Sequence, residues 1–404
     1  MNVTNLFFSV GLKSISIVFK FFFTTYLISK LSLSDYGYFS YYSMISGFLV
    51  FIYGLDFYNY IQYSLSKKKR DYDVINEHCS VIFYVFMLAF LFCILSYFLD
   101  VQSIIILVVF VGFSEYLLTE VYRYLVYFEK SKLSNFLLFI KTCSWPLFVI
   151  FSFFIFDEID VSQILLIWLI NNVAIIFLIG FHSFENEVLP KVKILKPKFI
   201  MNGLLFSFPY LISTLSYKLL EFLDRFYIGS KMNSDMLGIF STYMSFVGVI
   251  QTFIYVGVSA EFYPKLLKSE TKHEFMKVSG LMFSAILFSV LFLSAPIFGF
   301  FNYYSIFVGK PELTSNSSVF FILLVSNAFF CLSLVFHYML LKFGLNRFVL
   351  ISTLVSLCLS LLLYILFRPE NLISVSYIGL FSTTTLFILK GWFAYYGKSK
   401  FLFK

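Results

Sequence analysis

Charged side chains stand at helical spacing inside several long apolar runs of this sequence. Within residues 5–29, Lys13 and Lys20 fall on one helical face together with Ser9, Ser16 and Thr24. At a rise of about 1.5 Å per residue, the two lysines lie roughly 10 and 21 Å inside such a run. A charge at this depth in a membrane costs roughly 2.5–3.5 kcal/mol, and such residues usually face a polar interior. We therefore predict that both lysines line a water-filled cavity.

The second half of the chain repeats this pattern. Lys218, Glu221 and Arg225 are spaced by three and four residues inside the run 200–228, and Asp224 stands beside them. Residues at these spacings share a helical face. We expect this stripe to face the same polar interior as the lysines of the first run.

Further charges lie in the other apolar runs. Glu120 and Arg123 form a third stripe, with Glu115 earlier in the same run. Other charges inside the runs include Asp56, Lys141 and Lys390. Lys390 stands near the end of the last run, so we expect it to reach the membrane interface.

Lysine and arginine suit a phosphate or diphosphate, because they supply charge-assisted hydrogen bonds. We therefore predict six substrate-binding cations: Lys13, Lys20, Lys218, Arg123, Lys141 and Arg225. The acids are candidates for carrying a coupling ion or for pairing with the cations: Asp56, Glu115, Glu120, Glu221 and Asp224. Local pairing, of Glu221 with Arg225 and of Glu120 with Arg123, is the alternative interpretation.

The elements that hold these residues are membrane spans. The 404 residues are 60% hydrophobic and 13% charged, whereas a soluble domain carries about 25% charge. Apolar runs of about 20 residues, each long enough to cross a bilayer, recur throughout. We predict an all-α polytopic membrane protein with about twelve spans: 5–29, 36–62, 80–99, 102–128, 135–156, 161–182, 200–228, 236–263, 278–301, 318–341, 348–367 and 372–396.

The two halves of the chain resemble each other. A shift of 201 positions brings Tyr227, Lys231, Gly238 and Gly248 onto Tyr26, Lys30, Gly37 and Gly47. The polar segment 183–198 separates six spans from six. We predict two six-helix lobes, 1–190 and 191–404, related by a parallel repeat with the substrate between them.

Basic residues alternate between the connecting loops. The loops after every second span and the C-terminal tail hold nineteen lysines and arginines, and the opposite loops hold four. The positive-inside rule then places both termini in the cytoplasm. It also accounts for the net charge of +8 without a nucleic-acid partner.

Sequence motifs for catalysis are absent. The chain has neither a phosphate-binding loop nor a Gly-x-Ser-x-Gly elbow. Its five cysteines are scattered, without zinc spacing or a disulfide framework. We expect no catalytic residue, no metal and no cofactor, and therefore a transporter rather than an enzyme.

Short motifs at the turns carry a family resemblance. Residues 33–40 (LSDYGYFS) resemble the Leu-x-x-x-Gly-x-Tyr/Phe motif of bacterial polysaccharide-unit exporters. Residues 223–229 (LDRFYIG) and 237–241 (LGIFS) resemble the matching motif after the seventh span, and 261–266 (EFYPKL) the end of the eighth. The chain thus resembles the Wzx-type O-antigen or capsular repeat-unit flippases of the multidrug/oligosaccharidyl-lipid/polysaccharide exporter superfamily.

This resemblance implies transport of an undecaprenyl-diphosphate-linked oligosaccharide from the cytoplasmic to the periplasmic leaflet of the bacterial inner membrane. It also implies a polymerase and a chain-length regulator of the same pathway as partners. Asp224 and Arg225 match the family's Asp-Arg pair. Three alternatives remain: an O-antigen polymerase, a multidrug antiporter of the same superfamily and a membrane acyltransferase. The longest predicted outward loop, 302–317, is short for a polymerase.

Overall fold

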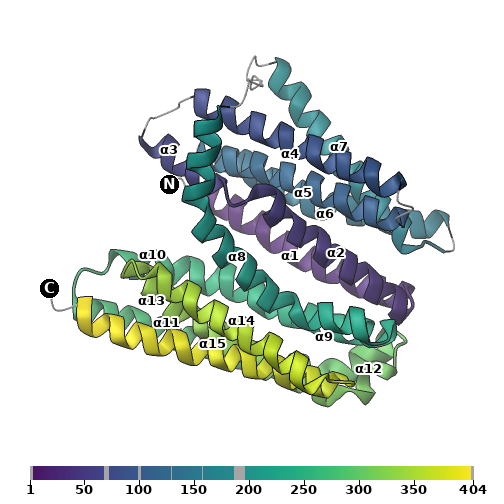
Figure 1. Ribbon diagram of the computed structural model, residues 1–404. Helices are drawn as coiled ribbons and strands as arrows, with labels where there is room; N and C mark the ends of the chain where they lie inside the picture. Colours follow the sequence, from purple (N-terminus) through teal and green to yellow (C-terminus); the bar gives the residue numbers. More distant parts are fainter. Residues whose placement is uncertain are drawn as a thin grey trace. The chain divides into compact units, whose positions relative to one another are not determined.

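The computed structural model describes residues 3–67, 72–98, 102–128, 130–156, 158–185 and 196–401. These residues form helices joined by short turns, which confirms the predicted all-α membrane class (Figure 1). The helices of the first half are α1 (Val3–Lys30), α2 (Leu33–Gly54), α3 (Tyr58–Lys67), α4 (Tyr72–Phe98), α5 (Ser103–Tyr127), α6 (Ser131–Ile155) and α7 (Val161–Glu185). Those of the second half are α8 (Pro197–Lys231), α9 (Ser234–Phe253), η1 (Ile254–Ser259), α10 (Ala260–Lys268), α11 (Lys272–Phe307), α12 (Glu312–Ser315), α13 (Ser317–Lys342), α14 (Asn346–Phe367) and α15 (Leu372–Phe401).

Ten helices of the described part are long and apolar enough to cross a membrane. An eleventh span results if α2 and α3, which meet at a bend of 46°, count as one. The sequence predicts one continuous span over 36–62, and in this respect it is wrong. Leu55 and Asp56 adopt positive φ angles of 46° and 49°, which end α2 and redirect the chain into α3.

The predicted eighth span is also irregular. α9, the π-helical segment η1 and α10 follow one another without a turn. The wider π-helical segment is a local feature that hydrophobic periodicity does not reveal. Further along, α11 runs to Phe307, six residues beyond the predicted end of its span, so the following connection is shorter than the sequence indicates.

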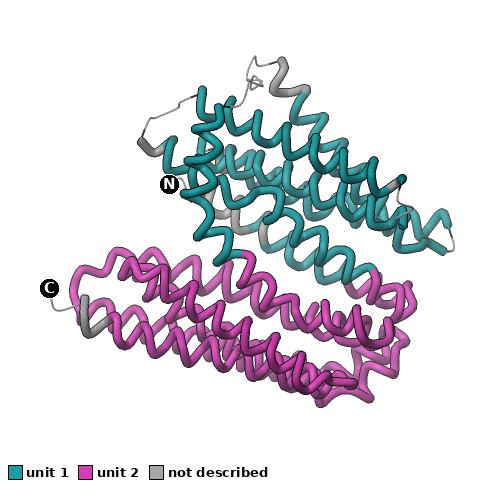
Figure 2. Tube along the Cα trace, viewed as in Figure 1, with its two compact units in different colours: residues 1–23, 39–214 teal, residues 24–38, 215–404 magenta. Residues whose placement is uncertain are grey.

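The chain divides into two compact units (Figure 2). Unit 1 comprises residues 1–23 and 39–214, and unit 2 comprises residues 24–38 and 215–404. The predicted boundary at 190/191 lies outside the described residues. Unit 2 therefore includes the end of α1 and the beginning of α2.

Within unit 1, α5 packs against α4, α6 and α7. Within unit 2, α13 packs against α9, α11 and α15, and α14 packs against α15. These central helices carry the buried apolar side chains, whereas much of the outer helix surface is apolar and exposed. That distribution is typical of a membrane protein, whose lipid-facing surface is as apolar as its core.

The turn between α1 and α2 contacts the turn between α8 and α9 inside unit 2. A Cβ atom added to Gly37 would lie 2.7 Å from the Ser234 carbonyl oxygen, and one added to Gly238 would clash with the Leu33 carbonyl oxygen. The Ser34 hydroxyl also donates a hydrogen bond to the Ser234 hydroxyl, at 2.7 Å. Gly37 and Gly238 are equivalent in the 201-residue repeat, so the two repeats meet at matching positions.

Candidate functional site

Glu115 is the centre of a polar cluster inside unit 1. The Lys141 ammonium lies 2.6 Å from its Oε2 atom. Its Oε1 atom accepts hydrogen bonds from Trp168 Nε1 at 2.9 Å and Asn172 Nδ2 at 3.0 Å. The Trp168 ring stacks on Trp145, with ring centroids 4.7 Å apart. Both oxygens of the Glu115 carboxylate therefore have partners. These partners lie on α6 and α7, so the cluster connects three helices of unit 1.

Glu120 and Arg123 form a second pair on α5. An Arg123 N–H donates to Glu120 Oε1, and the guanidinium carbon lies 4.4 Å from the centroid of the Tyr58 ring. The other Glu120 oxygen and Asp56 Oδ2 are buried and have no hydrogen-bond partner in the described part of the chain. Each of these two buried carboxylates thus has one unsatisfied oxygen, which could hold a proton or a cation. Asp56 also lies at the break between α2 and α3.

Unit 2 carries the stripe of α8. The Lys218 ammonium lies 2.7 Å from Glu221 Oε2, so the acid pairs with Lys218 rather than with Arg225. The Arg225 guanidinium carbon stands 5.0 Å from the centroid of the Phe222 ring. Its Nε atom is buried and has no acceptor among the described residues.

Asp224 faces the other side of α8 and is held within unit 2. The Tyr364 hydroxyl of α14 donates to Asp224 Oδ1 at 2.7 Å. A Cβ atom added to Gly379 of α15 would lie 2.6 Å from Asp224 Oδ2, so the carboxylate packs directly against that helix. Asp224 thus connects α8 to α14 and α15, whereas the Arg225 guanidinium lies beside the Phe222 ring.

Lys390 is completely buried on α15, with 0% of its surface exposed. The sequence expectation that it reaches the membrane interface is wrong. Its ammonium lies 5.8 Å from the centroid of the Tyr217 ring, and Nζ has no hydrogen-bond partner in the described structure. It is covered because α15 continues to Phe401, beyond the predicted end of the span, and packs along α13.

The two lysines of α1 belong to unit 1. The Lys13 side chain lies outside the described residues. Lys20 is exposed on its helix. The predicted site residues therefore divide between the units: Lys20, Asp56, Glu115, Glu120, Arg123 and Lys141 in unit 1, and Lys218, Glu221, Asp224 and Arg225 in unit 2. Contact of the six cations with one substrate stays a prediction.

Sequence reasoning missed the neutral partners of these charges. Trp168, Asn172 and Tyr364 each donate to a carboxylate in a membrane span. An available signal was the Asn171-Asn172 pair in the apolar run 161–182, since buried amides need partners. No comparable signal marks Tyr364, because tyrosine is common throughout the chain, and no charged residue near Trp168 in the run 161–182 indicates its role.

Several solved transporter structures have the same fold as this chain. An inward-facing multidrug resistance MATE family transporter of the MOP superfamily matches with a TM-score of 0.64 and 12% identity, over 97% of this chain and 98% of that one. The lipid II flippase MurJ, in an inward closed conformation, matches with a TM-score of 0.66 and 15% identity, over 95% and 87%. The eukaryotic MATE transporter AtDTX14 matches with a TM-score of 0.59 and 12% identity, over 98% of both chains.

No family model and no curated protein sequence matches the chain. At these identities the structural likeness establishes the fold and leaves the substrate to be argued from the site.

Proposed function

We propose that this chain is a flippase of the bacterial inner membrane, with both termini in the cytoplasm. It moves an undecaprenyl-diphosphate-linked oligosaccharide repeat unit from the cytoplasmic to the periplasmic leaflet by alternating access. The fold that it has in common with a lipid II flippase supports this proposal. The sequence motifs of the polysaccharide-unit exporters supply the substrate class.

The observation that carries the proposal is the surplus of cations inside unit 2. Residues 215–228 of α8 and 372–396 of α15 together hold Lys218, Arg225 and Lys390 against two acids, Glu221 and Asp224, and the Tyr364 hydroxyl donates to Asp224. Arg225 Nε and Lys390 Nζ have no acceptor among the described side chains and backbone. A diphosphate supplies both negative charge and acceptor oxygens.

A multidrug antiporter is the second candidate, because two of the similar structures are MATE transporters. A cationic drug gains nothing from unsatisfied lysine and arginine donors, whereas an anionic substrate does. The cation surplus therefore favours the flippase. A polymerase and a chain-length regulator are the partners that this function implies, since the delivered unit must be polymerised.

Lys218→Ala and Lys13→Ala test the proposal. Each removes one charge-assisted contact, worth about 1.5–3 kcal/mol, so we expect glycan export to fall at least about tenfold. The readout is surface glycan on a gel, at equal membrane protein level. Lys265→Ala, which removes an exposed partner of Glu261, is the matched control and should export normally. Full export by both test variants would rule out the cationic site.

A further inference from the structure

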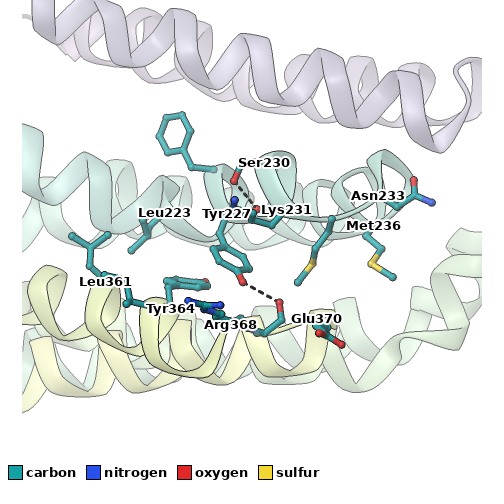
Figure 3. Close-up of a pocket in the computed structure, with 14 residues that line it drawn as sticks. Leu223, Tyr227, Ser230, Lys231, Asn233, Met236, Leu361, Tyr364, Arg368 and Glu370 are labelled. Atoms are coloured by element: carbon teal, nitrogen blue, oxygen red, sulfur yellow. Dashed lines mark hydrogen bonds between the residues drawn. The ribbon is translucent and has the colours of Figure 1, made fainter.

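Unit 2 contains a cavity of about 920 Å³ where α8 ends, α9 begins and α14 ends (Figure 3). This volume is in the upper part of the range typical of small-molecule sites. Lys231 and Arg368 lie on its wall, and we call it the basic pocket. Its remaining lining includes Tyr227, Tyr364 and Glu370.

Two tyrosines hold one wall of the basic pocket in place. The rings of Tyr227 and Tyr364 stack with centroids 4.4 Å apart. The Tyr227 hydroxyl donates to the Pro369 carbonyl oxygen at 3.2 Å, and the Tyr364 hydroxyl donates to Asp224. A dashed line from Tyr227 marks the first of these hydrogen bonds in Figure 3. Each ring is therefore held by stacking on the other ring and by the hydrogen bond of its own hydroxyl, so this wall is preorganised for a ligand.

The charge of the pocket is positive. Lys231 and Arg368 are exposed, and neither forms an ion pair with a carboxylate in the described part of the chain. Glu370 is the acidic residue of the lining, which leaves a net charge of +1. Arg368 has a left-handed conformation, with φ of 41°, and its N–H caps α14 by bonding the Tyr364 carbonyl oxygen.

The position of these two cations in the sequence is unusual. They belong to the loops that we predict to face outward, where the chain has four basic residues against nineteen in the opposite loops. The positive-inside rule leaves such loops poor in lysine and arginine. Two of the four nevertheless line one cavity, which indicates a role other than orientation.

One part of the pocket lining is apolar and continues onto an exposed apolar surface. Leu223, Leu361 and Ile365 line it. The last turn of α14 exposes Ile365, Leu366 and Phe367, at 70%, 67% and 71%. At the end of a membrane span, exposed apolar side chains of this kind face acyl chains. The pocket therefore offers a cationic part beside an apolar part.

We propose that the basic pocket binds an anionic membrane phospholipid, with its phosphodiester between Lys231 and Arg368 and its acyl chain along Leu361 and Ile365. The single negative charge of a phosphodiester matches the net charge of the pocket. A diphosphate carries more charge than the pocket neutralises, and free phosphate has no chain for the apolar wall. The proposal does not depend on which substrate the protein transports.

Native mass spectrometry of the purified protein with added phosphatidylglycerol or phosphatidylcholine tests this site. We expect phosphatidylglycerol to bind at least about tenfold more tightly than phosphatidylcholine, because only the former is anionic. Compared with the unchanged protein, the double variant Lys231→Gln, Arg368→Gln should bind phosphatidylglycerol at least about tenfold more weakly. Both side chains are exposed, so its thermal midpoint without lipid should match that of the unchanged protein.

The matched control is the double variant Lys30→Gln, Lys310→Gln, which removes the two other basic residues of the same predicted side. It should bind phosphatidylglycerol normally. Three results would each overturn the proposal: unchanged phosphatidylglycerol affinity in the pocket variant, an equal loss in the control, or competition by inorganic phosphate or a polyprenyl diphosphate at equal concentration.

Discussion

At the scale of single residues, the charged side chains inside the spans differ in how well they are satisfied. Glu115 accepts from Lys141, Trp168 and Asn172, and every partner comes from another helix. The Lys390 ammonium lies near the Tyr217 ring, and Nζ has no hydrogen-bond partner in the described structure. The carboxylate of Glu115 is therefore satisfied, whereas Lys390 is a buried donor without an acceptor, which costs free energy.

One substitution at two positions tests this difference. Lys390→Met removes a buried amine without an acceptor, so we expect it to stabilise the protein by about 1–3 kcal/mol, since such a group costs about that much. Lys141→Met leaves Glu115 without its cation, so it should destabilise the protein by a similar amount. Thermal unfolding in detergent measures both effects. A lower midpoint for Lys390→Met would show that its ammonium has a stabilising partner.

The partners of these residues could be predicted only in part. Spacing along a helix correctly brings Glu120 beside Arg123, because residues three apart share a face. It cannot choose between Lys218 and Arg225 as the partner of Glu221, since both lie on the same face. Spacing along a helix cannot predict the ion pair between Lys141 and Glu115, because the two residues lie on different helices whose relative rotation depends on tertiary packing.

At the scale of elements, apolar runs located the helices well, and the sequence missed their irregularities. The break at Leu55-Asp56 depends on two positive φ angles, which are uncommon for leucine and more common for aspartate. Gly54 was the one local signal for it. The π-helical turn η1 changes no hydrophobic pattern, so its position follows from packing rather than from composition.

Two glycine substitutions on α9 test the contact between the α1–α2 and α8–α9 turns. Gly238→Ala should destabilise the protein, because its Cβ atom would clash with the Leu33 carbonyl oxygen, which is backbone and cannot rotate away. Gly248→Ala lies on the same helix with nothing within 4 Å of the added atom, so it should stabilise the protein by up to about 1 kcal/mol. Thermal midpoints of the two variants should therefore move in opposite directions. A neutral Gly238→Ala would mean that the two turns do not pack this closely.

At the scale of the whole molecule, composition alone predicts a polytopic helical membrane protein, and this is confirmed. The 201-residue repeat is visible in the sequence because glycines and tyrosines recur at the turns. That the equivalent glycines touch each other could not be predicted, since a repeat fixes similarity and not contact. The likeness to MATE and MurJ transporters establishes the fold at an identity too low for sequence to reveal it.

The substrate is the central claim, and deletion of the chain in its native strain tests it most directly. Surface glycan is run on a gel, and carrier-linked oligosaccharide is extracted from the membrane in parallel. If the chain is the flippase, both the polymer and the single-unit form disappear from the surface while the carrier-linked unit accumulates. If one repeat unit still reaches the lipid acceptor, units cross the membrane without this protein, and the account is wrong.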